Sequence, residues 1–313
     1  MTPSCSLPDG APVGGAVIIP AHNEEAVIGR TLAGLASLGR SAAVDVLVVC
    51  NGCTDATADI ARGYSGVTVI EAEAASKPAA LNAGDRATPL WPRLYLDADI
   101  GIVPAAVEAV FRALSGPNAP LAARPESMVD TAGSSFPVRA YYRARARIPE
   151  SGVRLWGAGG YAVSRAGHER FAAFPEITAD DSYFDGLFID DEKTIVATVP
   201  MRVHAPRTTS TLLRILARHR RGQLELQLPA EESRRRVRAL VKGVRGPRSA
   251  VDAFCYAALT ALARMRTRGT VGLGTTTWET DASTRAASTA PPASATNATA
   301  AEAPSHTANV RCD

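Results

Sequence analysis

Short apolar runs rich in β-branched residues alternate with helical patterns through the first half of the chain, and this alternation constrains the fold more than any other feature. Strands that alternate with helices predict an α/β fold with a parallel sheet and right-handed crossovers. In such a sheet a ligand binds at the carboxyl ends of the strands, so the loops that follow the strands form the expected site. The expected strands are Ala16–Pro20, Val44–Cys50, Val67–Ile70 and Leu94–Asp97, and the expected helices are Glu25–Leu38, Asp55–Arg62, Pro78–Arg86 and Pro104–Leu114.

Three of these strand-end loops are polar and acidic: Pro20–Glu24, Asn51–Asp55 and Asp97–Asp99. None of them contains the G-x-G-x-x-G or G-x-x-x-x-G-K-S/T pattern, which excludes ordinary dinucleotide binding and P-loop chemistry. Two carboxylates one residue apart, as in Asp97-Ala98-Asp99, favour a hard divalent cation that shares its ligands with a diphosphate. The alternative for this loop is a solvated turn or a helix cap.

Four segments in this order resemble the family 2 glycosyltransferases of the GT-A fold. They are Val17–Glu25 (VIIPAHNEE), Asn51–Asp55 (NGCTD), Lys77–Gly84 (similar to K-x-x-A-L-N-x-G) and Asp97–Asp99 (D-x-D). The resemblance extends from about Ala16 to Gly222, or about two thirds of the chain. It implies a mostly parallel sheet flanked by helices, followed by a C-terminal helical annex. It also implies an enzyme that transfers a sugar from a nucleotide-diphosphate sugar to an acceptor hydroxyl.

The resemblance implies a set of residues around the donor. Asn23, Glu24 and Asp55 are expected to face the base and ribose, where their oxygens accept hydrogen bonds. For Asp55 the alternative is helix capping, and for Lys77 it is an exposed surface position. The expected donor-binding residues are Pro20, Ala21, Asn23, Glu24, Asn51, Asp55, Lys77, Asn82, Asp97, Ala98, Gly159 and Arg221.

The resemblance also implies a metal ion, Mn²⁺ or Mg²⁺, at the carboxylates after the fourth strand. Asp99 is expected to ligate the ion that bridges the donor phosphates, with Asp97 beside it. A late histidine often joins such a site, and His204 follows the apolar run Ile195–Val199 in that position. A structural histidine is the alternative. A bound cation stabilises the charge that develops on the leaving diphosphate.

Asp180-Asp181 is similar to the Glu-Asp pair that supplies the base in this family. An inverting transfer needs a carboxylate that takes the proton of the attacking hydroxyl. We expect the base to be Asp181, or Asp180 if the adjacent acids are matched in the other register. Near Arg221 the family carries Q-x-x-R-W, but this chain has Arg218 and Gly222 at the Gln and Trp positions. The missing Trp argues against close kinship with the processive polysaccharide synthases.

The charge of the chain is divided unevenly. Residues 1–201 contain 16 Lys and Arg against 23 Asp and Glu, whereas residues 202–268 contain 16 against 4. A basic segment of this kind indicates an anionic partner or solvated helix faces. The alternative function is therefore a non-catalytic protein that uses residues 202–268 to bind nucleic acid or an acidic membrane. With the resemblance we expect no nucleic acid, but a nucleotide-sugar donor and a small-molecule, lipid-linked or glycan acceptor, with a peripheral membrane contact in the basic segment.

The remaining features bear on organisation and location. Residues 1–15 lack the basic and apolar regions of a secretory signal, so we expect a cytoplasmic protein, peripheral at the inner face of the membrane if the basic segment binds lipid. The expected parts are a flexible leader (1–15), a GT-A catalytic domain (16–205), a basic helical annex (206–268) and a disordered Ala/Ser/Thr/Pro-rich tail (269–313). Cys50 and Cys53 form a C-x-x-C, which leaves a redox or metal function as a minor alternative.

Overall fold

A computed structural model describes residues 13–41, 43–73, 75–150, 152–226 and 231–267, so most of the expected leader and the expected tail lie outside the described residues. The described residues form a seven-stranded sheet. Its strands are β1 (Gly15–Ala21), β2 (Val44–Asn51), β3 (Val67–Ala72), β4 (Arg93–Leu96), β5 (Ala122–Asp130), β6 (Gly160–Val163) and β7 (Lys193–His204). The helices are α1 (Ile28–Leu35), α2 (Thr57–Arg62), α3 (Lys77–Ala87), α4 (Pro104–Ala113), α5 (Phe136–Ala146), α6 (Arg165–His168), α7 (Asp180–Gly186), α8 (Thr209–Glu225), α9 (Glu231–Lys242) and α10 (Pro247–Thr267), with 3₁₀ turns η1 (Leu38–Arg40) and η2 (Asp190–Glu192).

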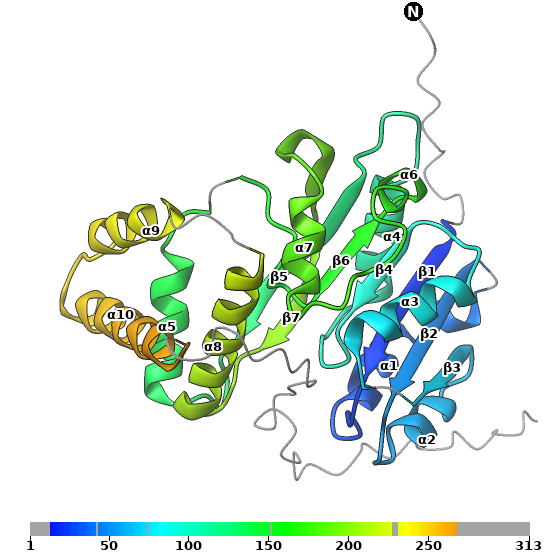
Figure 1. The fold of residues 1–313 in the computed structure, drawn as a ribbon, viewed down its shortest axis with the longest axis horizontal. Helices are drawn as coiled ribbons and strands as arrows, with labels where there is room; N and C mark the ends of the chain where they lie inside the picture. Colours follow the sequence, from blue (N-terminus) through cyan, green and yellow to red (C-terminus); the bar gives the residue numbers. More distant parts are fainter. Residues whose placement is uncertain (1–12, 42, 74, 151, 227–230, 268–313) are drawn as a thin grey trace, which may run out of the picture.

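The strand order is β3-β2-β1-β4-β6-β5-β7, and the sheet is mostly parallel, as the alternation of strands and helices predicted (Figure 1). β1 pairs in parallel with β2 on one side and with β4 on the other. β6 is the exception, because it runs antiparallel to both β4 and β5. The carboxyl ends of β1, β2 and β4 therefore meet at one edge of the sheet.

Both faces of the sheet are covered, which explains why every residue of β1 is buried. Successive side chains of a strand point to opposite faces. Val17 and Ile19 accordingly belong to one core cluster together with side chains of α1, α2 and α4. Ala16 and Ile18 belong to a second cluster with side chains of α3 and α7. The two apolar layers fix β1 at the centre of the molecule.

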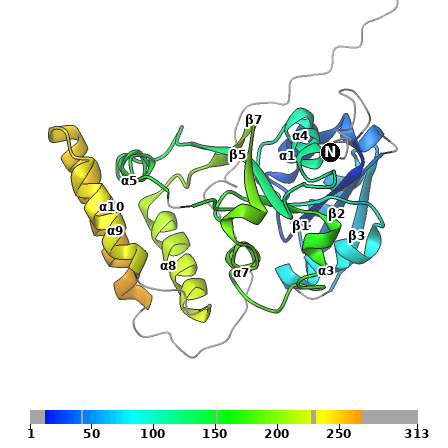
Figure 2. The same cartoon turned by 90° about the horizontal axis from the view of Figure 1, so that it is seen from above.

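A separate helical layer is attached to the β5–β7 side of the sheet. Figure 2 shows α5 and α8 between the sheet and α10, and both views place α9 and α10 farthest from β3. The layer has its own core, to which α5 contributes Val138 and Tyr141 and α10 contributes Leu259 and Ala263. Asp252 of α10 is buried and forms ion pairs with Arg143 at 2.6 Å and Arg147 at 2.9 Å. No helix in the described ranges has the length and apolar composition needed to cross a membrane.

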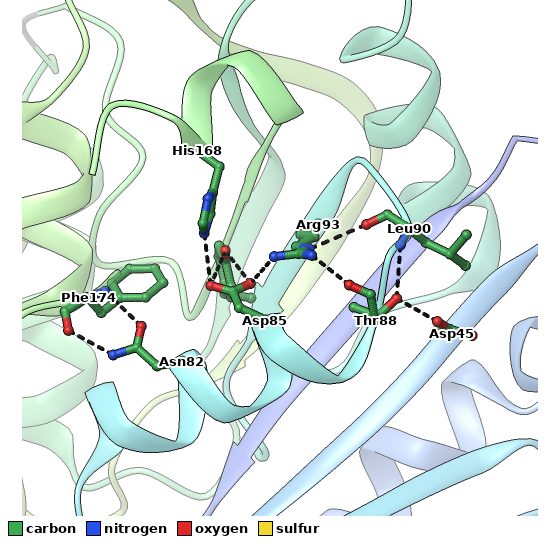
Figure 3. Close-up of polar contacts among 9 residues, drawn as sticks. Asp45, Asn82, Asp85, Thr88, Leu90, Arg93, His168 and Phe174 are labelled. Atoms are coloured by element: carbon green, nitrogen blue, oxygen red, sulfur yellow. Dashed lines mark hydrogen bonds and ion pairs between the residues drawn. The ribbon is translucent and has the colours of Figure 1, made fainter. Parts of the chain in front are cut away.

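A buried polar cluster at the amino-terminal end of β4 ties the sheet to two helices (Figure 3). Asp85 of α3 accepts hydrogen bonds from Arg93 at 2.8 Å and from the hydroxyl of Tyr95 at 2.9 Å. Its other carboxylate oxygen lies 3.0 Å from His168 Nε2. Because a buried carboxylate is stable only when it is paired and hydrogen-bonded, these contacts hold α3, β4 and α6 together. Local sequence patterns did not indicate this cluster, because His168 reaches Asp85 from 83 residues away and because Arg93 and Tyr95 lie in an apolar strand.

Candidate functional site

The loops after β1 and β2 are joined by polar contacts. Asn23 has a left-handed backbone (φ 53°), and its side-chain oxygen accepts a hydrogen bond of 2.8 Å from the Thr54 amide. His22 Nδ1 lies 2.6 Å from the carbonyl oxygen of Asn51. The Glu25 amide donates to Asp55 at 3.1 Å. The structure thus brings the expected Pro20–Glu24 and Asn51–Asp55 loops together at one edge of the sheet.

The carboxylate of Asp55 also caps the turn that leads into α2. It accepts a hydrogen bond of 3.0 Å from the Thr57 amide. Burial opposes the charge of Asp55, but hydrogen bonds from Thr57 and from the Glu25 amide outweigh it and hold the pKa of Asp55 below its ordinary value. Glu24 is buried, and its amide donates to the Thr57 hydroxyl at 2.7 Å. The expected contacts of Glu24 and Asp55 with a nucleotide stay predictions.

Asn51 and the C-x-x-C lie at the end of β2. The Asn51 side-chain amide donates to the carbonyl oxygen of Ser76, and its own oxygen is buried without a hydrogen-bond partner among the described residues. Cys50 and Cys53 are both free thiols, and Cys53 lies 3.5 Å from the carbonyl oxygen of Ala21. A redox function of this pair stays an alternative.

Lys77 joins the acidic loop after β4 to the acidic pair of α7. Its ammonium nitrogen lies 2.9 Å from Asp97 Oδ1 and 3.1 Å from Asp180 Oδ2. Burial disfavours the charged ammonium, but Asp180 and Asp97 outweigh it and raise the pKa of Lys77 above its ordinary value. The lysine is therefore a fixed positive charge between two groups of carboxylates.

The segment Lys77–Gly84 has a structural explanation at each position. Ala80, Leu81 and Gly84 face the sheet, and a Cβ on Gly84 would come within 2.4 Å of the Ile18 side chain. The Asn82 side chain donates to the Phe174 carbonyl at 2.9 Å and accepts from the Phe174 amide at 2.8 Å (Figure 3). Only glycine lets α3 approach β1 this closely. The motif packs one helix and holds the chain that leads to α7, while Lys77 alone reaches the carboxylates.

The two acids at the start of α7 lie in different environments. Asp180 is buried, and besides Lys77 it accepts a hydrogen bond of 2.7 Å from the Tyr161 hydroxyl. Burial raises the pKa of Asp180 above its ordinary value, against the opposing effect of Lys77. Asp181 is half-buried and accepts hydrogen bonds from the Gly157 amide at 2.8 Å and the Ser182 amide at 2.7 Å. Asp180 is locked into the protein, whereas part of Asp181 faces solvent.

The loop Asp97–Asp99 is held from two sides. The Asp97 amide donates to the Gly159 carbonyl at 2.8 Å, and the Ala98 carbonyl accepts from the Thr31 hydroxyl at 2.7 Å. Gly159 has a left-handed backbone (φ 75°), and a Cβ there would lie 2.4 Å from Ile100. The glycine loop between α5 and β6 therefore packs directly on the D-x-D loop.

The Asp97 and Asp99 carboxylates, which were expected to hold a cation, are both half-buried. Oxygen ligands of this kind suit Mg²⁺ or Mn²⁺, which take one or two carboxylates and complete their shell with phosphate and water. No group of three or more His, Cys, Asp or Glu side chains in the described ranges is arranged to hold a metal ion. His204 Nδ1 lies 3.9 Å from Asp130, and its role as a ligand stays a prediction.

Helix α8 packs tightly against the start of α7. Gly222 is buried, and a Cβ added to it would come within 2.5 Å of the Ala179 Cβ, next to Asp180. Position 222 therefore has no room for the Trp that follows the arginine in Q-x-x-R-W unless α8 moves. Arg221 lies beside this contact and is half-buried. Burial lowers the pKa of His219 of α8 to about 4.

Two hydrogen-bond donors to the acids of α7 were not expected from the sequence. They are the Tyr161 hydroxyl and the Gly157 backbone amide. Both belong to the segment Trp156–Tyr161, of which only Gly159 was expected in the site. A tyrosine or a glycine does not by itself indicate which group it will hydrogen-bond, and the acids that accept these bonds follow about twenty residues later. The contacts depend on β6 running antiparallel beside β4, which the local sequence pattern does not reveal.

Comparisons with known proteins bear on the family and the fold. The family model described as Glycosyl transferase family 2 matches residues 16–153. No curated protein sequence matches the chain. Among solved structures, the mannosyltransferase PcManGT from Pyrobaculum calidifontis, in complex with GDP-Man and Mn²⁺, superposes with a TM-score of 0.50 at 18% identity, covering 88% of this chain and 80% of that one. This likeness shows the fold and confirms the expected GT-A architecture.

Two further structures are similar to the chain. Staphylococcus aureus TarS 1–349 in complex with UDP-GlcNAc has a TM-score of 0.47 at 15% identity, covering 81% of this chain and 92% of that one. Glucosyl-3-phosphoglycerate synthase from Mycobacterium tuberculosis in complex with phosphoglyceric acid has a TM-score of 0.47 at 23% identity, covering 71% of this chain and 82% of that one.

Proposed function

Through residues 16–153 the chain belongs to glycosyl transferase family 2, and we propose that it moves a sugar from a nucleotide-diphosphate sugar to an acceptor hydroxyl with inversion at the anomeric carbon. The catalytic unit in this proposal is residues 16–205, and residues 206–268 form a helical annex. The annex shares a core with α5, so it is anchored to the catalytic unit.

One observation carries the proposal. The Lys77 ammonium contacts both Asp97 of the D-x-D loop and Asp180 of α7. The two groups of acids therefore lie on either side of this ammonium. A transferase of this class needs donor-side carboxylates and an acceptor-side base within reach of one anomeric carbon. Acids that only cap helices would not need to lie near one another. The approach of Asp97 and Asp180 through Lys77 therefore favours a catalytic site.

On the donor side, Asp99 and Asp97 would hold Mn²⁺ or Mg²⁺. When bound, the cation supplies charge stabilisation for the leaving diphosphate. The Pyrobaculum enzyme is described with GDP-Man and Mn²⁺, which supports a nucleotide sugar and this cation class as the ligands here. Lys77 keeps Asp97 in place, and Arg221 of α8 is the proposed contact for a phosphate oxygen.

On the acceptor side, Asp181 is the proposed base. Its carboxylate is partly accessible, and the amides of Gly157 and Ser182 fix its orientation. It takes the proton from the acceptor hydroxyl as that oxygen attacks the anomeric carbon. Asp180 is buried by Lys77 and Tyr161, so we assign it a positioning role for the start of α7. Asn82 acts through Phe174 in the same way.

The test is release of nucleoside diphosphate. We would incubate the purified protein with a panel of UDP-, GDP-, ADP- and dTDP-sugars in the presence of Mn²⁺. We would then measure the nucleoside diphosphate that is released when the sugar is slowly transferred to water. We expect one donor to be hydrolysed, and the activity to vanish with EDTA and in Asp99→Ala. Hydrolysis of no donor, or undiminished hydrolysis in Asp99→Ala, would overturn the proposal.

A further inference from the structure

The outward face of α10 presents a continuous apolar stripe. Val251, Phe254, Leu262 and Met265 are 45, 72, 42 and 55% exposed, respectively. At 100° per residue these positions lie on one face of the helix, and Ala258 lies on the same face. Successive members recur at helical spacing, so the stripe is about 21 Å long. An exposed apolar surface of this extent on one helix marks an interaction site.

The stripe is not needed to hold the helix in place. The opposite face of α10 carries the buried side chains of Asp252, Leu259 and Ala263. Leu259 and Ala263 pack with α5 and α8, and Asp252 is paired with Arg143 of α5 and with Arg147, the residue that follows α5. Figure 2 shows that α10 lies in the outermost layer, with its partners α5 and α8 on the sheet side. The stripe is therefore an additional face rather than a badly packed core.

Positive charge accompanies the stripe. Arg248 and Arg266 are exposed and lie along one flank of it, 80° around the helix from its centre line. On α9, the exposed Val237 and Val241 recur at the same helical spacing, with Lys242 exposed beside them. Between 202 and 268 the chain has 16 Lys and Arg but 4 Asp and Glu. Apolar side chains flanked by arginines are complementary to a partner that has an apolar interior and anionic groups at its surface.

We propose that the outer face of α10 docks into the interface of a lipid bilayer that contains acidic lipids. The helix lies in the plane of the membrane, with Phe254 and Met265 inserted below the headgroups and Arg248 and Arg266 on the lipid phosphates. This places the annex against the bilayer and leaves the catalytic edge of the sheet in water. The inference does not depend on glycosyl transfer, and its tests do not measure activity.

The first test is hydroxyl-radical footprinting of the full chain, read by mass spectrometry at Phe254 and Met265. We use vesicles of phosphatidylcholine alone and with 30% phosphatidylglycerol. Rapid oxidation in buffer, with protection only by the acidic vesicles, is expected. Protection in buffer at every protein concentration means that residues 268–313 cover the stripe. Protection that grows with protein concentration means that a second copy covers it. Either result, or no protection by vesicles, overturns the proposal.

The second test is co-sedimentation with the same vesicles. Phe254→Ser combined with Met265→Ser should weaken binding at least about tenfold, because two inserted side chains are lost. Arg248→Gln with Arg266→Gln should weaken it about tenfold at 50 mM salt and little at 500 mM. Ile189→Ser, which removes an exposed apolar side chain just before η2, is the matched control and should bind as the parent does. Equal binding by all four proteins contradicts the docking face.

Discussion

The Lys77 ammonium lies 3.1 Å from the buried carboxylate of Asp180, so α3 and α7 are joined by an ion pair at the centre of the acidic site. Because Asp180 is desolvated, its charge depends on this partner. Lys77→Met should therefore raise the pKa of Asp180 further and lower kcat/KM about a hundredfold, since Asp97 of the D-x-D loop loses its partner together with Asp180. Lys77→Arg keeps the positive charge and should retain more activity than Lys77→Met. Carbon-13 NMR titration of the carboxyls and steady-state kinetics check both effects. An unchanged Asp180 pKa in Lys77→Met would contradict this role.

The two adjacent acids should separate by kinetics. Asp181→Asn removes the proposed base and should lower kcat by about 10²- to 10⁴-fold with donor binding unchanged. Asp180→Asn should chiefly lower the melting temperature, because the pair with Lys77 is lost. Asp191→Asn, an exposed acid on η2, is the control and should behave as the parent does. A larger loss of kcat in Asp180→Asn than in Asp181→Asn would reverse the two assignments.

The contact between α8 and α7 should be sensitive to one methyl group. Gly222→Ala places a Cβ within 2.5 Å of the Ala179 Cβ, and overpacking should destabilise the protein by about 1–3 kcal/mol. Gly186→Ala, where no described atom lies within 4 Å of the added Cβ, should not destabilise it. Adding Ala179→Gly to Gly222→Ala should restore stability. Urea unfolding gives the free energy of unfolding of all four proteins. A Gly222→Ala protein as stable as the parent would contradict the steric explanation.

The buried Asp252 should make stability depend on pH. Hydrogen bonds from Arg143, with Arg147 assisting, hold the pKa of Asp252 below its ordinary value. A lowered carboxyl pKa stabilises the fold fully above the unfolded pKa, near 3.9, and the stabilisation is lost as pH falls through the folded value. Asp252→Asn should cost about 3 kcal/mol at pH 7, and its deficit should shrink below about pH 4.

The control for that measurement is Asp59→Asn. Asp59 also pairs with an arginine, Arg62 at 2.9 Å, but its side chain is 82% exposed. An exposed pair contributes little, so this variant should change the unfolding free energy by less than about 1 kcal/mol. A pH-independent deficit for Asp252→Asn would show that its charge is not what stabilises the annex.

The sequence predicted the parallel part of the sheet because β1, β2 and β4 are continuous apolar runs between helical patterns. It did not indicate β5, whose residues Ala122–Asp130 include Pro125 and become exposed after it. The sequence indicated that Asp97 and Asp180 share one site only through its resemblance to the family 2 glycosyltransferases. Their approach depends on Lys77, which reaches both acids from α3, and on tertiary packing that local periodicity does not encode. The pairing of Asp252 with α5 was missed for the same reason.

The central claim is that the acidic edge of the sheet binds a nucleoside diphosphate with a divalent cation. Isothermal titration calorimetry with UDP, GDP, ADP and dTDP in Mn²⁺ tests it most directly. The account predicts that one diphosphate binds with a Kd between about 1 µM and 1 mM. In Asp99→Asn this binding should weaken at least about tenfold, while Asp191→Asn binds as the parent does. Binding of no diphosphate, or equal affinity in Asp99→Asn, would contradict the account.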